Sequence, residues 1–253
     1  MSRTSNTLII GKVLEHYEKC SSTNFVAKQI LAKSKPPDGM VVSTDNQTEG
    51  RGQYGNQWQS EAYQNLAFSV ILYPRILISE QFYLSKIASI ACVEALNSIT
   101  NLGFQIKWPN DVYFKNKKVG GLLIENQIIG EQIGNSVVGI GINLNQEKFE
   151  GLPQASSIYL LVRYLLNRKK CIEIILEHLD VWYLKLKQGK FQTIDQAYYS
   201  YLMGFQEIIT YMENGTKKTG KLKGVNQTGQ LLVEENGRQR QFDFKTIEWV
   251  FSL

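Results

Sequence analysis

The spacing of apolar and polar positions divides the chain into helical and extended segments. Apolar residues three or four positions apart predict helices at residues 22–34 and 79–101. The same spacing returns over residues 156–187, as two helices broken near 167–168, and in a last helix that Thr193 is expected to cap. Short apolar runs and alternating stretches between the helices are typical of strands. Those strands are expected at residues 41–42, 66–73, 105–114, 119–127 and 136–145.

The pattern changes after Gly204, where helical spacing gives way to short alternating segments. The turn signals Asn214-Gly215 and Asn236-Gly237 lie between these segments. We therefore expect two domains in the 253-residue chain: residues 1–203, and a small β module, folded as a barrel, at 204–253. Strands of the module are expected at residues 207–212, 220–225, 230–234, 239–244 and 247–251.

A long polar segment at residues 46–65 contains the strongest local motif, Gly50-Arg51-Gly52-Gln53-Tyr54-Gly55. A dinucleotide-binding G-x-G-x-x-G must follow a strand and open a helix, whereas this one leads through loop into a strand. The H-R-D and D-F-G signatures that accompany a kinase glycine loop are absent from the sequence. The glycines are more typical of a loop that closes on an anion, with Arg51 as a fork-shaped donor for a phosphate or carboxylate.

A second motif, Lys107-Trp108-Pro109-Asn110-Asp111, falls within an expected strand. Proline cannot donate a hydrogen bond to a sheet, so Pro109 indicates an edge or a bulge that re-aims the polar side chains beside it. Lys118 follows, just before Gly120-Gly121. Paired glycines in a strand commonly mark the close approach of a ligand or of another backbone.

Strict alternation is clearest over residues 137–145. One face carries apolar residues and should turn toward a core, namely Val138, Ile140, Ile142 and Leu144. The opposite face carries Gly139, Gly141, Asn143 and Asn145. Two glycines followed by two asparagines predict a flat floor with a polar end, which suits a ligand. A glycine-rich strand packed tightly under a helix is the alternative.

Composition excludes several classes of protein. Hydrophobic residues make up 43% and charged residues 20%, which is ordinary for a soluble globular chain. No apolar run approaches the roughly 18 residues of a membrane helix, and the first residues do not form a secretory signal. A net charge of +5 favours an anionic ligand but is weak for DNA binding. Three scattered cysteines and two histidines argue against disulfides, a histidine metal site and a Ser–His–Asp triad. We expect reduced thiols, a cytoplasmic location, and no membrane or DNA partner.

Taken in order, the motifs resemble those of the biotin–protein ligases. The resemblance spans residues 20–145 approximately and includes Ser22-Thr23-Asn24, Gln47-Thr48, the glycine motif with Trp58, the segment 107–111, Lys118 and Gly139-Ile140-Gly141-Ile142-Asn143. It implies an α+β fold, in which a class II aminoacyl-tRNA synthetase-like mixed sheet with helices is followed by a small SH3-like β-barrel. It also implies a two-step, Mg²⁺-dependent reaction. Biotin and ATP give biotinyl-5′-AMP, and biotin then passes to a lysine of a biotin carboxyl carrier protein, as in acetyl-CoA carboxylase.

The resemblance also implies roles for individual residues. Lys118 and Arg51 would be catalytic, because cations must screen the repulsion between a carboxylate and a phosphate. Asp111 would position a lysine or Mg²⁺, and the metal ligands stay open. ATP would contact Arg51, Gln53, Trp58, Asn110, Lys118 and Asn143. Biotin would contact Ser22, Thr23, Asn24, Gln47, Gly50, Arg51, Gly52, Gln53, Lys118, Gly121, Leu123, Gly139 and Gly141.

One position departs from the family pattern. Gln53 stands where these ligases commonly carry a second loop arginine, so a hydrogen-bonding group replaces a full charge. Two alternatives to a biotin ligase are a lipoate- or octanoyl-protein ligase-like enzyme and a non-enzymatic biotin-binding regulator. Whether the protein is a monomer or a homodimer is not legible from the sequence.

Overall fold

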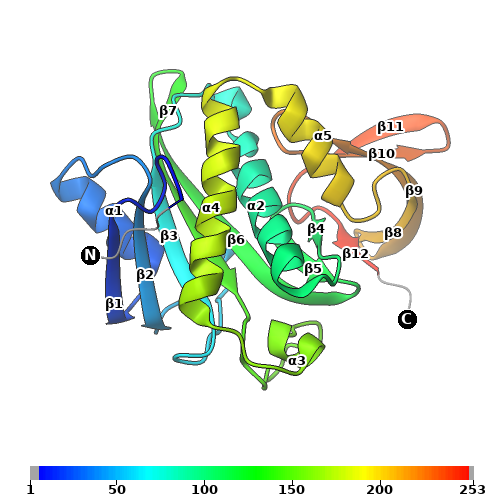
Figure 1. The fold of residues 1–253 in the computed structure, drawn as a ribbon. Helices are drawn as coiled ribbons and strands as arrows, with labels where there is room; N and C mark the ends of the chain where they lie inside the picture. The colour runs from blue at the N-terminus through cyan, green and yellow to red at the C-terminus, as the bar shows by residue number, and fades with distance from the viewer. Residues whose placement is uncertain (1–5, 251–253) are drawn as a thin grey trace.

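A seven-stranded mixed sheet forms the centre of the protein. The computed structural model describes residues 6–250. The strand order across the sheet is β1-β2-β3-β7-β6-β5-β4, and only the edge pair β1–β2 is parallel (Figure 1). The strands are β1 (Leu14–Cys20), β2 (Met40–Gln47), β3 (Leu66–Leu72), β4 (Gln105–Lys107), β5 (Asp111–Phe114), β6 (Lys117–Ile129) and β7 (Gln132–Ile142).

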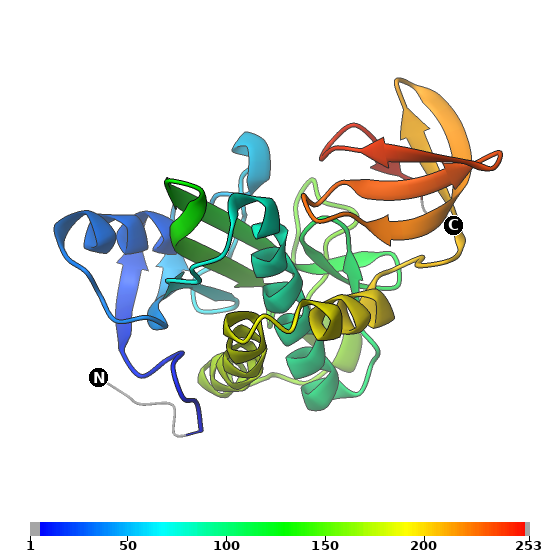
Figure 2. The same ribbon diagram turned by 90° about the horizontal axis from the view of Figure 1, so that it is seen from above.

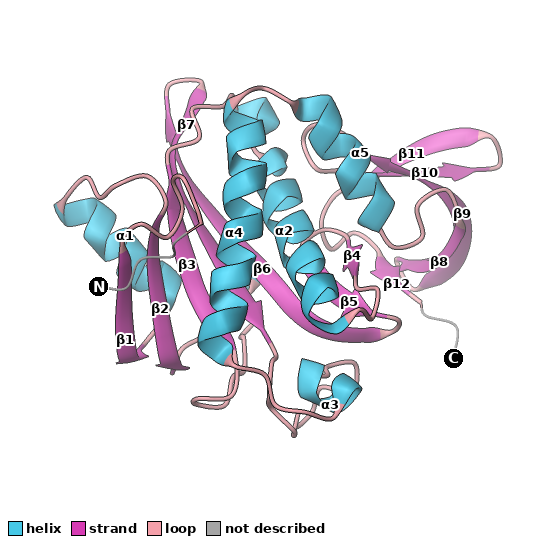
Figure 3. Cartoon of the chain, viewed as in Figure 1, coloured by secondary structure: helices cyan, strands magenta, loops and turns pink. Residues whose placement is uncertain are grey.

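Helices cover the two faces of this sheet unequally. The long helices α2 (Phe82–Thr100) and α4 (Arg168–Lys187) pack side by side on one face, and α5 (Phe191–Tyr201) lies against α2 (Figure 3). The shorter α1 (Thr23–Lys33) covers only part of the opposite face, against β2, β3 and β7. A short helix, α3 (Ile158–Val162), leads into α4. The open part of the α1 face is therefore where the sheet is free to form a site.

Alternation along β3 shows how the sequence builds both layers. Phe68 and Val70 are fully buried in the main core with α2, whereas Ile71 belongs to a smaller cluster under α1. Ser69, between them, is buried on the α1 face although it is polar. Because successive side chains on a strand point to opposite faces, a polar residue there indicates a site and not a core.

A second, five-stranded antiparallel sheet lies beside the β4–β5 end of the first (Figure 2). Its order is β11-β10-β9-β8-β12. Trp108 joins the two sheets, since its indole N–H donates to the carbonyl of Gly229 at 2.8 Å and its ring lies 5.3 Å from that of Phe244. The strands are β8 (Ile208–Glu213), β9 (Thr216–Val225), β10 (Leu231–Glu235), β11 (Arg238–Phe242) and β12 (Glu248–Trp249).

The predicted helices are confirmed, but some strand predictions are wrong. The segment 105–114 is not one strand: β4 and β5 form a hairpin around a turn that contains a cis peptide bond before Pro109. The sequence did not predict β1, because an exposed parallel edge strand carries little apolar signal. Thr193 does not cap α5, which begins two residues earlier, and a 3₁₀ turn (Ile78–Glu80) precedes α2. The last residue predicted for the final strand, 251, lies outside the described residues.

Two other expectations concern the cysteines and membranes. Cys92 and Cys171 are buried free thiols, as expected, whereas Cys20 at the end of β1 is only half-buried. Burial raises the pKa of the Cys92 thiol to about 12. Among residues 6–250, no helix is long and apolar enough to cross a membrane.

Candidate active site

A cavity of about 910 Å³ opens on the α1 face of the large sheet. The N-terminus of α1, the end of β2 and the polar segment 46–65 form one side, and β5, β6 and β7 form the floor. Of the residues predicted to bind ligands, the following line it: Ser22, Thr23, Asn24, Gln47, Arg51, Gly52, Gln53, Trp58, Asn110, Lys118, Gly121, Leu123, Gly139, Gly141 and Asn143, together with Asp111. Gly50 alone of the predicted set is not among the lining residues.

Glycines form the floor because neighbouring groups approach the backbone closely. A Cβ on Gly141 would lie 2.6 Å from Cε2 of Trp58, and one on Gly139 would collide with the Asn24 carboxamide oxygen. Gly121, on β6, is paired with Gly141 and lies under the same indole. The flat floor predicted from alternation in β7 is thus present, and its glycines leave room for side chains from other elements.

Buried polar groups close one end of the cavity. The Ser69 hydroxyl lies 2.7 Å from the Thr23 hydroxyl and 2.6 Å from the Asn24 carboxamide oxygen. The Gln47 side-chain oxygen accepts from the backbone N–H of Thr23 at 3.0 Å. These groups are held by each other and by α1, so this end presents fixed donors and acceptors beside the glycine floor.

Asn24 also ties the wall to β6. Its amide donates to the carbonyl of Leu123 at 3.2 Å and to the Glu125 carboxylate at 2.9 Å. The Lys28 ammonium lies 2.6 Å from the same carboxylate. Burial alone would raise the pKa of Glu125, but the hydrogen bonds from Lys28 and Asn24 outweigh it and lower the pKa. The hydrogen bonds of the Asn24 side chain therefore go to Leu123, Glu125 and Ser69, and they connect α1 to the strands of the sheet.

The glycine motif forms a hairpin-like loop over the cavity. Gly50 and Trp58 pair, since the N–H of Trp58 donates to the Gly50 carbonyl at 2.9 Å, and a Cβ on Gly50 would collide with the Trp58 carbonyl. The N–H of Gly52 donates to the carbonyl of Asn56 at 2.7 Å, across a 3₁₀ turn at Gln53–Gly55. Gly50 is thus required by backbone packing, while exposed Arg51 is carried over the opening.

Trp58 lies inside the cavity against the glycine floor. Its indole N–H is buried and makes no hydrogen bond to any described residue. The Lys118 ammonium lies 6.0 Å from the centre of the Trp58 ring. A buried donor without a partner is costly, so the Trp58 N–H is a donor that faces the cavity without a protein acceptor among the described residues.

Lys118 and Asp111 form the charged centre of the cavity. The Lys118 ammonium lies 2.5 Å from the Asp111 carboxylate, and the two side chains are one-third and 15% exposed. The segment 154–156 holds the backbone of Lys118, because the Lys118 N–H donates to the Gln154 carbonyl and the Lys118 carbonyl accepts from the N–H of Ser156. A cation fixed in this way beside the loop that carries Arg51 (residues 46–65, the arginine loop) is suited to hold an anion.

Two asparagines offer hydrogen-bonding groups at the other side of the floor. The Asn143 amide donates to the Ser156 carbonyl at 3.0 Å, which leaves its oxygen buried and without a donor among the described residues. The Asn110 amide donates to the Leu122 carbonyl, which accepts on the β6 side of the turn. The open oxygen of Asn143 is an acceptor for an amino group of a ligand.

Comparisons with known proteins identify the family to which this cavity belongs. The model of the biotin/lipoate A/B protein ligase family matches residues 17–143, which include most of the cavity. The bifunctional ligase/repressor BirA of Bacillus subtilis (strain 168) is 31% identical over 238 residues, covering 91% of this chain and 72% of that protein. This chain belongs to the biotin/lipoate A/B protein ligase family.

Solved structures of biotin protein ligases share the fold. The ligase from Aquifex aeolicus in complex with biotin and ATP has a TM-score of 0.77 at 28% identity and covers 95% of this chain and all of its own. A biotin–[acetyl-CoA-carboxylase] ligase of Paracoccus denitrificans is 27% identical over 87% of this chain and 94% of that protein. The resemblance to biotin–protein ligases is confirmed, and so is the class II synthetase-like mixed sheet followed by an SH3-like β module.

Several residues that line the cavity were missed by sequence reasoning, as was Ser69, which packs behind Thr23 and Asn24 at its polar end. Ser69 gave no signal, because one serine in an apolar strand is common. The segment 149–155 brings Phe149 and Leu152 to the rim, and its only signal was the Gly151-Leu152-Pro153 breaker. Phe244 and Lys245 reach the cavity from the second sheet, which no local pattern could indicate.

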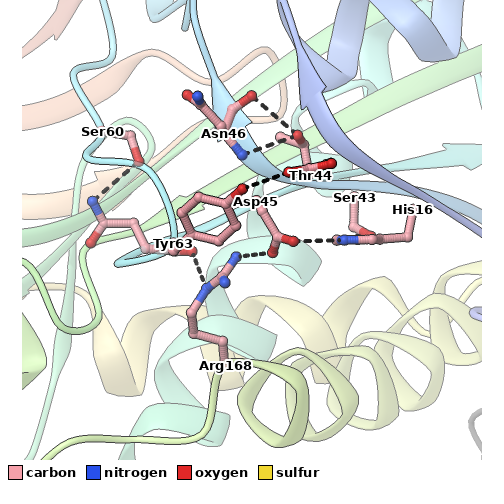
Figure 4. A network of polar contacts seen from close by, with 10 residues as sticks. His16, Ser43, Thr44, Asp45, Asn46, Ser60, Tyr63 and Arg168 are labelled. Carbon is pink, nitrogen blue, oxygen red and sulfur yellow. Dashed lines mark hydrogen bonds and ion pairs between the residues drawn. The ribbon is translucent and has the colours of Figure 1, made fainter.

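A polar network anchors the far end of the arginine loop in this ligase fold (Figure 4). The Asp45 carboxylate lies 2.6 Å from the Arg168 guanidinium and 2.9 Å from the His16 ring, and its carbonyl accepts from the N–H of Tyr63. Burial would raise the pKa of Asp45, but hydrogen bonds from Arg168 and His16 lower it. These contacts fix the loop where it leaves β2 and where it rejoins β3.

Proposed function

We propose that the cavity makes biotinyl-5′-AMP from biotin and ATP, and that the protein then transfers biotin to a lysine of a carrier domain. One observation carries the proposal: a single cavity joins a buried polar end, a glycine floor, an arginine loop and the Lys118–Asp111 pair. The solved Aquifex aeolicus relative carries both biotin and ATP by its description. A site that takes both molecules must hold a carboxylate beside a phosphate, which needs the cations found here.

Biotin fits the polar end of the cavity. Its ureido ring needs a few fixed donors and acceptors in a largely apolar pocket, and Ser22, Thr23 and Gln47 supply them. The rest of biotin would lie in the cavity beside the Trp58 ring and the Asn24 side chain, which pack over the glycine floor. In this proposal Asn24 and Gly50 do not contact biotin directly. Asn24 fixes α1 against β6, and Gly50 allows the backbone of the arginine loop to pack against Trp58. The remaining contacts are Arg51, Gly52, Gln53, Lys118, Gly121, Leu123, Gly139 and Gly141.

Lys118 and Arg51 carry the first step. A carboxylate oxygen of biotin attacks the α-phosphorus of ATP, a new oxygen–phosphorus bond forms, and the bond to pyrophosphate breaks. Two anions must approach, so the reaction requires cations that stabilise the charge as it is redistributed. Lys118 is fixed at the floor and Arg51 comes from above with the loop. Water is kept from the acyl-adenylate when the loop closes.

ATP occupies the side of the floor near Trp58. The indole offers a face for stacking on the adenine, and the buried oxygen of Asn143 accepts from the amino group of the base. Asn110 and Gln53 complete this subsite. Magnesium arrives with the nucleotide as MgATP, where it is held largely by phosphates and waters. Asp111 is the single carboxylate among the described lining residues, so one protein ligand is available to that ion.

The second step transfers biotin to a carrier. The carrier lysine amine attacks the carbonyl carbon of the adenylate, an amide forms, and AMP leaves with the oxygen that biotin brought. The names of the Paracoccus denitrificans and Mycobacterium tuberculosis relatives support the biotin carboxyl carrier of acetyl-CoA carboxylase as the partner. Three expectations stay predictions: a cytoplasmic location, a domain boundary at 203–204 and the absence of DNA binding. Both a monomer and a homodimer are compatible with the proposal.

Pyrophosphate release tests the proposed first step and its main alternative. Protein incubated with MgATP should release pyrophosphate when biotin is added, and not when lipoate or octanoate is added. Preference for lipoate or octanoate would favour the related lipoate-type ligases, which belong to the same family. Binding of biotin without any pyrophosphate release would favour the non-enzymatic regulator.

A further inference from the structure

Lys107 lies on the same sheet face as the charged centre, yet it is not among the residues that line the cavity. It is the direct cross-strand partner of Asp111 in the β4–β5 hairpin. Directly paired residues place their side chains on one face, about 5 Å apart at Cβ. Asp111 is therefore flanked by two lysines: Lys118, in contact at 2.5 Å, and Lys107 across the hairpin.

Two aromatic rings hold the Lys107 ammonium. It lies 5.3 Å from the centre of the Tyr113 ring and 5.9 Å from that of Trp249, which belongs to β12 of the second sheet. Within residues 6–250, no carboxylate lies close enough to form an ion pair with it. Burial, and to a lesser degree Lys118, lower the pKa of Lys107, while Asp111 raises it. The charge is thus kept near Asp111 by ring faces and not by a salt bridge.

The second sheet contributes to this arrangement through the ring of Trp249. Trp249 packs against the backbone of Gly204, where a Cβ would lie 3.5 Å from the ring. The neighbouring contact between Trp108 and Gly229 fixes the same side of the second sheet against the hairpin. Cation–π contacts are worth more when the ammonium is shielded from water, so the position of Lys107 depends on the second sheet.

We propose that Lys107 is a positioning residue for adenylation, whose charge, held by Trp249 from the second sheet, balances Asp111 when Lys118 turns to the phosphates. The inference rests on the proposed function. MgATP brings several negative charges close to Asp111, and a carboxylate without a second cation would repel them. Lys107 supplies that cation without touching the substrate. Lys118 is then free to donate to the reacting anions while Asp111 stays in place.

The first test separates a charge effect from a structural one. Lys107→Met should lower kcat/KM for ATP about tenfold, mostly through KM, because it removes a charge near the phosphates. Lys107→Arg keeps the charge and stacks on aromatic faces, so it should recover most of the loss. Biotin binding without ATP, measured by calorimetry, should be unchanged. Lys115→Met is the matched control: this exposed lysine lies 5.5 Å from the Phe114 ring in the next turn and should have no effect.

The second test examines the link to the second sheet. Trp249→Leu should raise KM for ATP about threefold in the wild-type background and have little further effect together with Lys107→Met, since both changes act through one contact. Full additivity would contradict the inference, as would ATP kinetics of Lys107→Met within twofold of wild type, or an equal loss in Lys107→Arg. If Lys107→Met does not fold, the other two variants test the inference: Trp249→Leu should raise KM for ATP about threefold, and Lys107→Arg should keep most of the wild-type kcat/KM. Wild-type protein that releases no pyrophosphate would instead refute the proposed function.

Discussion

The indole ring of Trp58 lies against the backbone of Gly141, on the floor of the cavity. A Cβ at position 141 would be 2.6 Å from the ring, closer than packed atoms tolerate. Trp58 belongs to the arginine loop and Gly141 to β7, so this contact, together with that of the same ring over Gly121 on β6, joins the loop to the sheet. The loop and the floor are thus coupled through the Trp58 ring and the missing side chains of Gly141 and Gly121.

Gly141→Ala tests that coupling. The added methyl group should push the indole from the floor and raise KM for ATP by about tenfold, since overpacking of this kind costs roughly 1–3 kcal/mol. Trp58→Ala serves as the second background, in which the same substitution should cost much less. Steady-state pyrophosphate release measures both. An equal loss in the two backgrounds would show that Gly141 acts without Trp58.

Lys118→Ala should slow adenylation by roughly 100-fold or more, by analogy with the ~3–4 kcal/mol cost of removing one transition-state donor. The lysine is the fixed cation of the cavity and contacts Asp111 at 2.5 Å. Single-turnover pyrophosphate release measures the step, and biotin binding without ATP checks that the fold survives. A rate within threefold of wild type would remove Lys118 from the mechanism.

Gln53 stands where the resemblance to biotin–protein ligases implies a second loop arginine. It lines the cavity in the turn beside Arg51. A charge-assisted hydrogen bond is about twice as strong as a neutral one, so Gln53→Arg should slow release of preformed biotinyl-5′-AMP several-fold. The rate of the first step should stay within a few-fold, because Arg51 and Lys118 still face the phosphate. Equal or faster release would mean that position 53 does not contact the intermediate.

Acid should weaken the network around Asp45. Its pKa is lowered in the folded protein, so the unfolded chain binds more protons as the pH falls toward the unfolded value of about 3.9. The stability contribution is therefore present above that value and lost as pH falls through the lower folded pKa. In urea unfolding from pH 6 to pH 3, Asp45→Asn should be less stable near neutrality and should lose stability less steeply with acid. Glu150→Gln, at an exposed position, controls for removal of a carboxylate, and parallel curves for wild type and Asp45→Asn would contradict the account.

The candidate site was largely predictable because its residues lie in short local motifs. Lys118 and Asp111 were both singled out before any geometry, and alternation along β7 correctly separated the core side chains from the glycine floor. Local patterns failed where tertiary packing decides. The turn at Pro109 splits an expected strand in two, and Lys245 reaches the cavity from a sheet that is remote in sequence.

Lys107 shows the same limit for function. From the sequence alone, this residue was assigned no role of its own. Only the fold reveals that the Lys107 ammonium lies 5.9 Å from the ring of Trp249, far along the chain, and that Lys107 does not line the cavity. A motif can indicate which residues form a site, but the role of each residue depends on contacts between elements that are far apart in the sequence.

Transfer of biotin to a carrier tests the central claim most directly. The protein should be incubated with biotin, MgATP and the biotin carboxyl carrier domain of acetyl-CoA carboxylase, and the carrier mass followed by intact-protein mass spectrometry. The account predicts that the carrier gains one biotin less one water, at a single lysine, only when biotin and MgATP are both present. A carrier whose mass does not change while Lys118 is intact, or one that gains lipoate or octanoate instead, would contradict it.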